Sequence, residues 1–381
     1  MITVGALIAA AVYHDPDTDS GSSGAVPVGV LPPGGGGTAF GPAIPRNQVS
    51  PAVDPCAATI AGMPLRRRVA QLVQVGVRAE EESDALTAAS EQVGGIFLAG
   101  DATGLLTSGR IAEVKAITKL PLTVSVDDEG GRVQRVDELD GDIPSARRMA
   151  ATMSPVQVRV LAKARGEALR TRGVTMDLAP VVDTSSQPDR AVIGDRAFSS
   201  DPAVAREYAA AFASGLRDAG IQPVLKHFPG HGNAIGDSHA GLATTAPLTD
   251  LRAQDLVPYR DIGAYGDIAV MVGHLDVPGL TDGAPASLNP AAYRLLRDEF
   301  AFDGVAMTDD LGAMRAVTDR VDLPDAVLGA ISAGADVALW SSGGRVDEVL
   351  DHLEQAATTG RLTPDRLSES LHRVLRSKAV C

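Results

Sequence analysis

The sequence predicts a single (β/α)8 barrel, the TIM-barrel fold, and three observations support this prediction. Eight short apolar runs alternate along the chain with amphipathic segments of helical period, which is typical of repeated βα units. A last helical segment follows the eighth run. No run is followed by a GxGxxG phosphate-binding motif. A doubly wound sheet has the same alternation, but eight units without that motif favour closure into a barrel.

The apolar runs predict the strands of the barrel in chain order. They are residues 71–77, 94–100, 122–128, 175–183, 223–230, 268–274, 304–310 and 336–340. Between them, segments 154–173 and 201–220 have a helical period and end in glycine, as helices commonly do. The final helix is expected at 363–380. No low-complexity stretch interrupts residues 56–381, so we expect them to form one domain.

Residues 1–55 differ from the rest of the chain in composition. Residues 1–13 form an apolar run that is too short to span a bilayer and resembles the apolar part of a secretory signal, although no basic residue precedes it. The following residues are rich in glycine, proline, serine and aspartate, which predicts a flexible, disordered tether. We therefore expect an exported protein at the cell envelope or outside the cell, without stable membrane insertion. A cytoplasmic location is the alternative.

The two cysteines, Cys56 and Cys381, lie at the two ends of the expected domain. In an exported protein such a pair can form a disulfide that joins the ends of the fold, and two free thiols are the alternative.

Composition and charge restrict the class of partner. The chain has 381 residues and a formal net charge of −14, which argues against a nucleic-acid partner because phosphates need a basic surface. Aromatic residues make up 3% of the chain and include a single tryptophan, which argues against a sugar cleft built on stacked tryptophans. Polar contacts are then expected to carry most of the recognition. We expect a monomer.

Polar residues gather at the C-terminal ends of the expected strands. These residues are Asp127, Asp177, Asp183, Lys226, His227, His274, Asp309 and Asp310. A single aspartate after a strand is most simply a helix cap, but capping poorly explains five strands that all end in polar residues. In a (β/α)8 enzyme the C-terminal rim carries the active site, so the pattern predicts an active site there.

Residues 226–245, which begin at the end of the fifth strand, contain three histidines, His227, His231 and His239, and three interpretations are open. They could bind zinc, with His274 and Asp309 as ligands from other strands, although the FPG sequence between the first two forbids the helix that joins such ligands at this spacing. They could carry out proton transfer. His231 could also simply hold the loop through backbone hydrogen bonds.

Asp237 and His239 favour proton transfer. They flank one residue, so in an extended segment both side chains project to the same side. A carboxylate beside an imidazole fixes its tautomer, which suits a proton shuttle. The nucleophile must then come from elsewhere, and Asp309 directly follows the seventh strand. A carboxylate nucleophile with a proton donor is the equipment of a retaining glycosidase, here with a histidine in the place that glutamate usually holds.

Four motifs together resemble glycoside hydrolase family 3, in its β-N-acetylglucosaminidase branch. They are KHFPGHGNAIGDSH, SVDDEGGRVQR, AVIGDRAF and FDGVAMTDDLGAM, and the resemblance extends over about residues 60–375. The chain ends soon after the eighth strand, without the second domain of many β-glucosidases in the family. This fits the branch in which a histidine and its aspartate replace the acid/base carboxylate of that domain. The sequence departs from the family at Asn233, where aspartate is frequent, and at Asp128, where glutamine is frequent.

The resemblance implies roles for individual residues. Asp309 would be the nucleophile, and His239, oriented by Asp237, would be the general acid and base. The residues implied in sugar binding are Asp127, Arg196, Lys226, His227 and, with less support, His274. Residues 129–132 would shape the turn after the third strand, and Asp310 would support Asp309. No metal or other cofactor is expected.

The function implied is that of a retaining exo-β-N-acetylglucosaminidase. It would hydrolyse terminal N-acetylglucosamine (GlcNAc) from peptidoglycan-derived muropeptides or related glycans, in cell-wall turnover or recycling. Two alternatives keep the fold and mechanism, namely a β-glucosidase and a phosphorylase in which phosphate replaces water. A metal-dependent barrel hydrolase and a non-catalytic wall-binding protein are the others.

Overall fold

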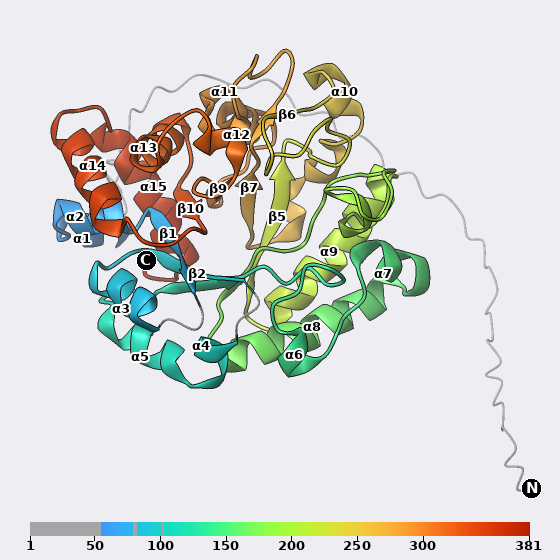
Figure 1. Cartoon of the computed structure of the whole chain (residues 1–381), viewed down its shortest axis with the longest axis horizontal. Coiled ribbons are helices and arrows are strands. Elements are labelled where there is room, and N and C mark those ends of the chain that lie inside the picture. Colours follow the sequence, from blue (N-terminus) through green and yellow to red (C-terminus); the bar gives the residue numbers. More distant parts are fainter. Residues whose placement is uncertain (1–54, 79–81, 101–102) are drawn as a thin grey trace, which may run out of the picture. The chain divides into compact units, whose positions relative to one another are not determined.

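The structure, a computed structural model, describes residues 55–78, 82–100 and 103–381 (Figure 1). The expected apolar start and tether lie outside the described residues, apart from Pro55, which begins helix α1. Within the described ranges no helix combines the length and the apolar character that a membrane span requires.

Eight parallel strands close into a barrel, which confirms the predicted (β/α)8 fold (Figure 1). They are β1 (Val73–Arg78), β2 (Gly95–Ala99), β3 (Thr123–Val126), β4 (Met176–Asp177), β5 (Gln222–Phe228), β7 (Ala269–Val272), β9 (Ala306–Asp310) and β10 (Val337–Trp340). Each of the eight expected runs contains or overlaps one of these strands. Pairing of β1 with β10, in the register Val73 to Ala338, closes the ring. All eight strands are parallel to their neighbours, so their C-terminal ends meet on one rim.

The sequence did not predict a second, small sheet. Strands β6 (Ala243–Thr244) and β8 (Leu275–Asp276) pair in parallel outside the barrel. Thr244 also pairs with Ile235 of the histidine segment through two backbone hydrogen bonds of 2.8 and 3.0 Å. The small sheet therefore attaches the loop after β5 to the segment that follows β7.

Helices surround the barrel. They are α1 (Pro55–Ala61), α2 (Leu65–Ala70), α3 (Glu82–Ser90), α4 (Gly104–Thr107), α5 (Arg110–Ile117), α6 (Asp137–Asp140), α7 (Ala146–Thr152), α8 (Pro155–Thr171), α9 (Pro202–Asp218), α10 (Leu248–Ala253), α11 (Pro290–Arg294), α12 (Arg315–Thr318), α13 (Leu323–Ala333), α14 (Val346–Thr358) and α15 (Pro364–Ser377). Short 3₁₀ turns include η1 (Gly194–Arg196), and a π-helical turn, η5, covers Leu295–Glu299. Helices α8 and α9, expected at 154–173 and 201–220, pack against each other.

The N-termini of α8 and α9 show why these helices begin where they do. The Ser154 hydroxyl accepts a hydrogen bond from the backbone N–H of Gln157, whose side chain accepts one from the backbone N–H of Ser154. This reciprocal capping box satisfies two N–H groups that have no partner inside the helix. Asp201 caps α9 in a simpler way, through the backbone N–H groups of two following residues.

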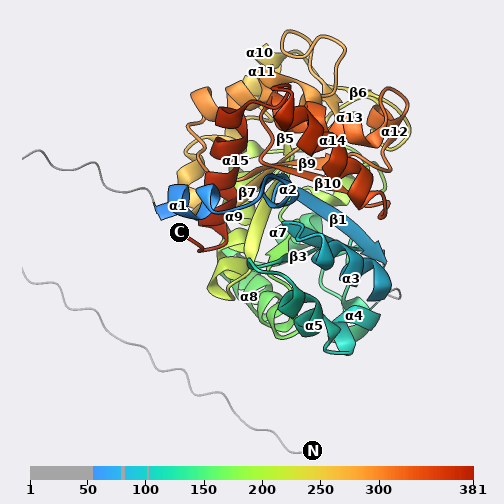
Figure 2. The ribbon, with the colours of Figure 1, turned by 90° about the vertical axis from the view of Figure 1, so that its left-hand side faces the viewer.

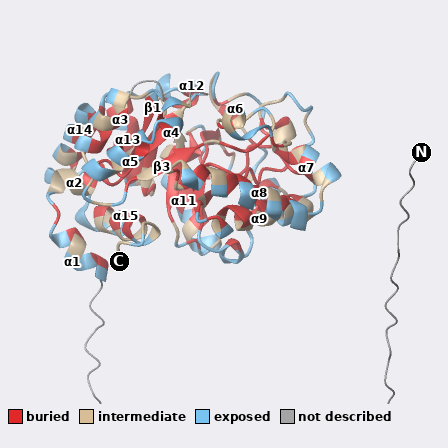
Figure 3. Ribbon diagram, turned by 90° about the horizontal axis from the view of Figure 1, so that it is seen from below, coloured by how far each residue is buried: buried red, intermediate tan, exposed pale blue. Residues whose placement is uncertain are grey.

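The core lies inside the barrel and between the strands and the helices (Figure 3). Barrel strands are buried on both faces, so their apolar residues run almost without interruption, as in β2 and β7. Trp340 at the end of β10 is fully buried, and its indole N–H donates to the carbonyl of Gly344.

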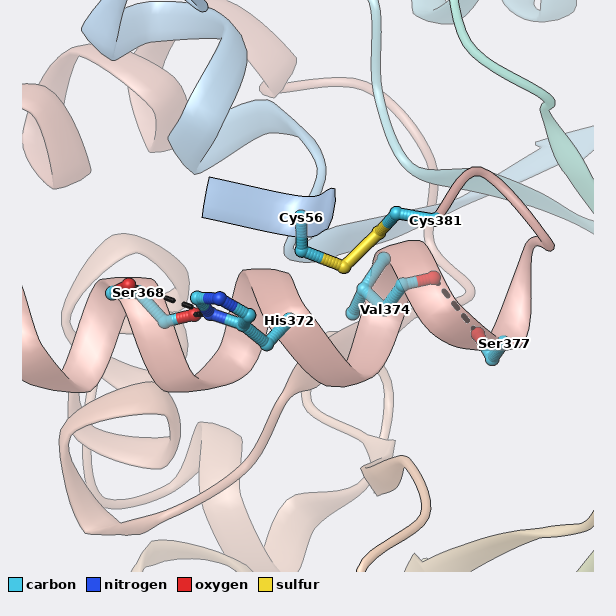
Figure 4. Close-up of a disulfide and its surroundings, with 6 residues drawn as sticks. All are labelled: Cys56, Ser368, His372, Val374, Ser377 and Cys381. Carbon is cyan, nitrogen blue, oxygen red and sulfur yellow. Dashed lines mark hydrogen bonds between the residues drawn. A yellow bond between two sulfur atoms is a disulfide. The ribbon is translucent and has the colours of Figure 1, made fainter. Parts of the chain in front are cut away.

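A disulfide joins Cys56 in α1 to Cys381 at the end of the chain, over a sequence separation of 325 residues (Figure 4). Helix α1 packs on α15, and the C-terminus returns beside it (Figure 2). The sequence left a disulfide and two free thiols open, and the structure has the disulfide, which joins the two ends of the described fold.

Candidate active site

A cavity of about 570 Å³ opens at the C-terminal ends of the strands, where the sequence predicted the site. Its wall includes most of the residues that the sequence singled out, namely Asp127, Arg196, Lys226, His227, His231, Asp237, His239, Asp309 and Asp310. These residues come from β5, β9, η1 and the loops that follow β3 and β5. The barrel thus brings together side chains that lie up to 183 positions apart in the sequence, from Asp127 to Asp310.

Asp309 is the penultimate residue of strand β9 and lines the cavity. Its Oδ1 accepts the backbone N–H of Asp310 at 2.8 Å. Burial alone would raise the pKa of Asp309, but this hydrogen bond and the charges of nearby groups, led by His227 and His274, lower it to about 2. The carboxylate is therefore ionised at neutral pH and able to act as a nucleophile.

Asp310 has a different environment, as expected for adjacent residues of a strand. Its Oδ1 accepts the backbone N–H groups of Gly312 and Ser341, both at 2.9 Å, and its Oδ2 is hydrogen bonded to the Ser341 hydroxyl. These bonds tie the end of β9 to the end of β10. Asp310 thus holds the strand end that presents Asp309.

Glu129 lies between two cations, a role that the sequence did not reveal. One of its oxygens is 2.6 Å from Lys226 Nζ and 2.7 Å from Arg196 Nη2, and the other is 2.8 Å from Arg196 Nε. Lys226 Nζ is also 2.6 Å from Asp127 Oδ1. Burial would raise the pKa of Glu129, but Arg196 and Lys226 hold it far below its usual range. Residues 129–132 were expected to shape a turn, and the backbone N–H groups of Glu129 and Gly130 do donate to the carbonyl of Val133, at 2.9 and 3.0 Å. The carboxylate of Glu129 in addition fixes two expected sugar-binding residues.

Asp183 anchors the loop that follows β5. Its Oδ2 is 2.7 Å from His227 Nδ1, and its Oδ1 accepts the backbone N–H of His231 at 2.7 Å. Burial would raise the pKa of Asp183, but His227 and His231 lower it. His231 is buried, and its Nε2 lies 3.2 Å from the Ser238 hydroxyl. His231 therefore holds the loop, as one interpretation of the sequence expected.

His239 and Asp237 form a pair on the exposed part of the same loop. Asp237 Oδ1 lies 2.8 Å from His239 Nδ1 and accepts the backbone N–H of His239 at 2.9 Å. Burial would raise the pKa of Asp237, but these two contacts with His239 lower it. The carbonyls of Ser238 and His239 accept backbone N–H groups at the start of α12. Because α12 follows β9, these two hydrogen bonds attach the loop to the segment after Asp309. The side chains of His239 and Asp309 line the same cavity.

Three of the rim residues lie behind the cavity wall. His274 is fully buried, with Nδ1 2.6 Å from the Ser287 hydroxyl and Nε2 2.8 Å from the carbonyl of Asp310. It was expected to line the sugar pocket, and the structure places it where it supports the end of β9. Asp183 binds the loop histidines. Asp177 is buried and accepts the backbone N–H of Asp128 at 2.9 Å, and burial raises its pKa well above the usual range.

The zinc interpretation required the histidines to converge. In the part of the chain that the structure describes, no three histidine, cysteine or carboxylate side chains are grouped as metal ligands. Instead His227 contacts Asp183, His231 contacts Ser238, and His239 contacts Asp237.

Three further arginines line the cavity, Arg132, Arg135 and Arg190, which the sequence did not single out. Arg132 Nε donates to Asp195 at 2.8 Å, and its Nη2 donates to the carbonyls of Ala191, Val192 and Ile193. Arg132 and Arg135 belong to the motif SVDDEGGRVQR, but the sequence did not predict a place at the cavity for them or for Arg190, because the fold alone brings the three side chains there.

One barrel cavity thus contains an ionised carboxylate and, apart from it, an imidazole–carboxylate pair. A retaining glycoside hydrolase needs a carboxylate nucleophile and a group that exchanges a proton, and these side chains can supply both. Comparison with known proteins agrees with this class. Residues 64–377 match the model of the glycosyl hydrolase family 3 N-terminal domain, and the chain belongs to glycoside hydrolase family 3.

Individual relatives extend this result. The chain is 48% identical to β-hexosaminidase LpqI of Mycobacterium tuberculosis H37Rv, over 95% of this chain and 90% of that protein. It is similar to the crystal structure of a family 3 glycosyl hydrolase from Mycobacterium smegmatis, with a TM-score of 0.81, 49% identity, and coverage of 84% of this chain and 98% of that one. A family 3 β-N-acetylglucosaminidase from Paenibacillus sp. FPU-7 gives a TM-score of 0.77 and 30% identity, covering 84% of this chain and 63% of that one. The chain is a glycoside hydrolase.

Proposed function

We propose that this chain is a retaining exo-β-N-acetylglucosaminidase that removes terminal GlcNAc from peptidoglycan fragments. The observation that supports this most is the 48% identity to a β-hexosaminidase over nearly the whole chain. The cavity agrees with it, since Asp309 and the Asp237–His239 pair line the same wall.

In the first step, an oxygen of Asp309 attacks the anomeric carbon as the bond to the leaving group breaks. The product is a covalent glycosyl ester, and the developing positive charge on the sugar ring is stabilised by the same carboxylate. Because Nδ1 of His239 faces Asp237, its Nε2 carries the proton that passes to the leaving oxygen. Proton donation by a well-placed group accelerates such a step by roughly 10²–10⁴-fold.

In the second step the roles of His239 reverse. Its neutral Nε2 takes a proton from water, and the water oxygen attacks the anomeric carbon and releases Asp309. Two displacements at one carbon return the sugar with its original configuration. Asp237 keeps Nδ1 protonated in both steps, so Nε2 alone exchanges its proton.

The polar network around Lys226 is proposed to bind the sugar hydroxyls. Asp127 faces the cavity while its carboxylate contacts Lys226, and Arg196 is held by Glu129. The ammonium of Lys226 and the guanidinium of Arg196 are thus fixed in position before the sugar binds, which reduces the conformational entropy lost on binding. We propose that His227, oriented by Asp183, completes the pocket from the same strand.

We infer that the enzyme works at the cell envelope or outside the cell. The apolar start of the sequence supports export, and so does the disulfide between Cys56 and Cys381, since disulfides persist in oxidising compartments. Fractionation of cells that express the full chain tests this, because recovery of the protein only in the cytoplasm would contradict it.

The first experiment compares initial rates on p-nitrophenyl β-N-acetylglucosaminide and p-nitrophenyl β-glucoside, for the wild type and Asp309→Ala. The proposal predicts a strong preference for the acetamido sugar and loss of activity in the variant. Asp298→Asn is a matched control, because Asp298 is exposed on η5 and does not line the cavity. Preference for glucose would instead indicate a β-glucosidase, and acceleration by added phosphate would indicate a phosphorylase.

A further inference from the structure

Arg190 differs from the other cationic side chains of the cavity in having no partner. Lys226 and Arg196 are paired with Glu129, and Arg132 is paired with Asp195. Arg190 lines the same cavity and is exposed, yet it has no hydrogen bond, ion pair or ring contact with any residue that the structure describes. Even the carboxylate of its neighbour Asp189 is engaged elsewhere, 2.7 Å from Arg147.

The backbone that carries Arg190 is held firmly on both sides. Arg147 donates to the carbonyls of Ser185, Gln187 and Gly194, at 3.1, 2.9 and 2.7 Å. As described above, Arg132 binds the carbonyls of residues 191–193. The backbone N–H of Asp195 donates to the carbonyl of Asp189 at 3.1 Å and closes the loop on itself.

Gly194 makes that closure possible. It has a φ of +48°, and a Cβ at this position would come within 2.4 Å of the Asp189 carbonyl oxygen. Two arginines thus fix the loop so that Arg190 is presented to the cavity by a rigid backbone. Fixing a binding group in advance reduces the cost of binding.

The loop lies next to the segment that carries the proposed proton donor. Gln187 Nε2 donates to the carbonyl of Ala234, at 3.3 Å, in the loop that contains Asp237 and His239. A general acid must reach the oxygen of the leaving group, so this wall of the cavity belongs to the aglycone and not to the GlcNAc unit. Arg190 is therefore on the aglycone side.

We propose that Arg190 binds a carboxylate on the aglycone, and that the enzyme consequently prefers substrates whose aglycone is acidic. The proposal rests on the proposed function and specifies its substrate class. A guanidinium and a carboxylate pair in one plane through two parallel hydrogen bonds. Arg190 can form such a pair with the aglycone because no carboxylate in the described part of the chain neutralises its charge. An exposed pair of this kind is weak, so we expect a preference of about two- to fivefold and not an absolute requirement.

The test uses two chromogenic substrates that differ by one carboxylate, 4-nitrophenyl and 3-carboxy-4-nitrophenyl N-acetyl-β-glucosaminide. The quantity measured is the ratio of kcat/KM for the acidic substrate to kcat/KM for the neutral one. Comparison of this ratio between variants cancels the different intrinsic reactivities of the two leaving groups. Arg190→Gln should lower the ratio by about two- to fivefold, mainly through KM of the acidic substrate, and Arg190→Glu should lower it further. Salt at 0.5 M should reduce the wild-type ratio, because exposed ion pairs are screened.

Arg148→Gln is the matched control. Arg148 is exposed on α7, outside the cavity wall, and should leave both substrates unaffected. A ratio in Arg190→Gln and Arg190→Glu equal to that of the wild type would overturn the proposal while leaving the proposed function intact. If the wild type hydrolysed neither substrate, both the Arg190 proposal and the proposed function would be overturned. The two outcomes therefore distinguish failure of the Arg190 proposal alone from failure of the proposed function.

Discussion

One oxygen of Asp237 contacts both the backbone and the ring of His239. Oδ1 accepts the backbone N–H at 2.9 Å and lies 2.8 Å from Nδ1, so a single carboxylate fixes the position of the residue and the tautomer of its imidazole. The pair is exposed, whereas Asp309 is set into the barrel end. The two groups that the proposed mechanism requires thus come from separate elements and differ in burial.

Replacing His239 with glutamine should lower kcat by roughly 10²–10⁴-fold on natural glycosides, because the leaving oxygen loses its proton donor. The loss should be smaller for nitrophenyl glycosides, whose leaving group needs little protonation. His352→Gln is a matched control, since His352 also pairs with an aspartate, Asp325, at 2.9 Å and lies outside the cavity wall. Equal losses on both kinds of substrate would argue against His239 as the acid.

Replacing Glu129 with glutamine should destabilise the fold and weaken substrate binding. The change leaves Arg196 and Lys226 without the carboxylate that compensates both charges, and removal of one partner from a buried ion pair costs about 3–5 kcal/mol. We expect a lower free energy of unfolding in denaturant titrations and a higher KM. Glu299→Gln is the control, because Glu299 forms an exposed pair with Arg252 that should contribute at most about 1 kcal/mol. A similar small effect at Glu129 would contradict the account of the network.

Replacing Cys381 with serine should lower the free energy of unfolding by about 2–5 kcal/mol, because the disulfide closes a very long loop and restricts the unfolded chain. Activity should remain, since neither cysteine lines the active-site cavity. A reductant should shift the melting temperature of the wild type to that of the variant and leave the variant unchanged. Insensitivity of the wild type to reductant would show that the bond does not stabilise the fold.

Asp255 should make stability depend on pH. It is buried beneath the histidine loop, where burial and the nearby Asp183 raise its pKa from 3.8 to about 6. A raised carboxyl pKa means that the folded state binds the proton more tightly, so this group favours folding below pH 4. The contribution is lost as the pH rises to 6. About 2 pKa units correspond to about 3 kcal/mol at most.

Asp255→Asn removes this charge and keeps its hydrogen bonds. Both Thr184 and Asn233 donate to Oδ1, at 3.1 and 3.5 Å, and an amide oxygen can take its place. The variant should be more stable than the wild type above pH 6, with the difference vanishing near pH 4. Asp298→Asn, at an exposed position, should show no such dependence when melting temperatures are compared across pH. A constant difference at all pH values would contradict the assignment to Asp255.

The sequence was sufficient to predict the barrel, because strands buried on both faces produce apolar runs with few polar interruptions. It was less successful with the fourth strand, expected at 175–183 and observed at 176–177. Pro180 has no N–H for the strand ladder, so regular pairing stops before it. An isolated bridge of Val181 with Lys226 continues the contact beyond the proline.

Contacts between distant segments could not be predicted. Asp183 contacts His227, which is 44 residues away, and Glu129 contacts Arg196, which is 67 residues away. No local pattern records such pairs, because they depend on which strand ends the closed barrel brings together. For His274 the local pattern predicted a contact that the structure does not show. Its position at a strand end predicted a place at the cavity, yet its ring contacts the Ser287 hydroxyl and the Asp310 carbonyl.

The proposed mechanism requires Asp309 to form a covalent bond with GlcNAc during turnover. A 5-fluoro glycosyl fluoride of GlcNAc slows the second step more than the first and so accumulates the intermediate, which can be located by mass spectrometry of peptides from the quenched enzyme. We predict one adduct, on the peptide that contains Asp309, and no adduct in Asp309→Ala. An adduct on another carboxylate, or turnover of the reagent without any adduct and with inversion of the sugar, would contradict it.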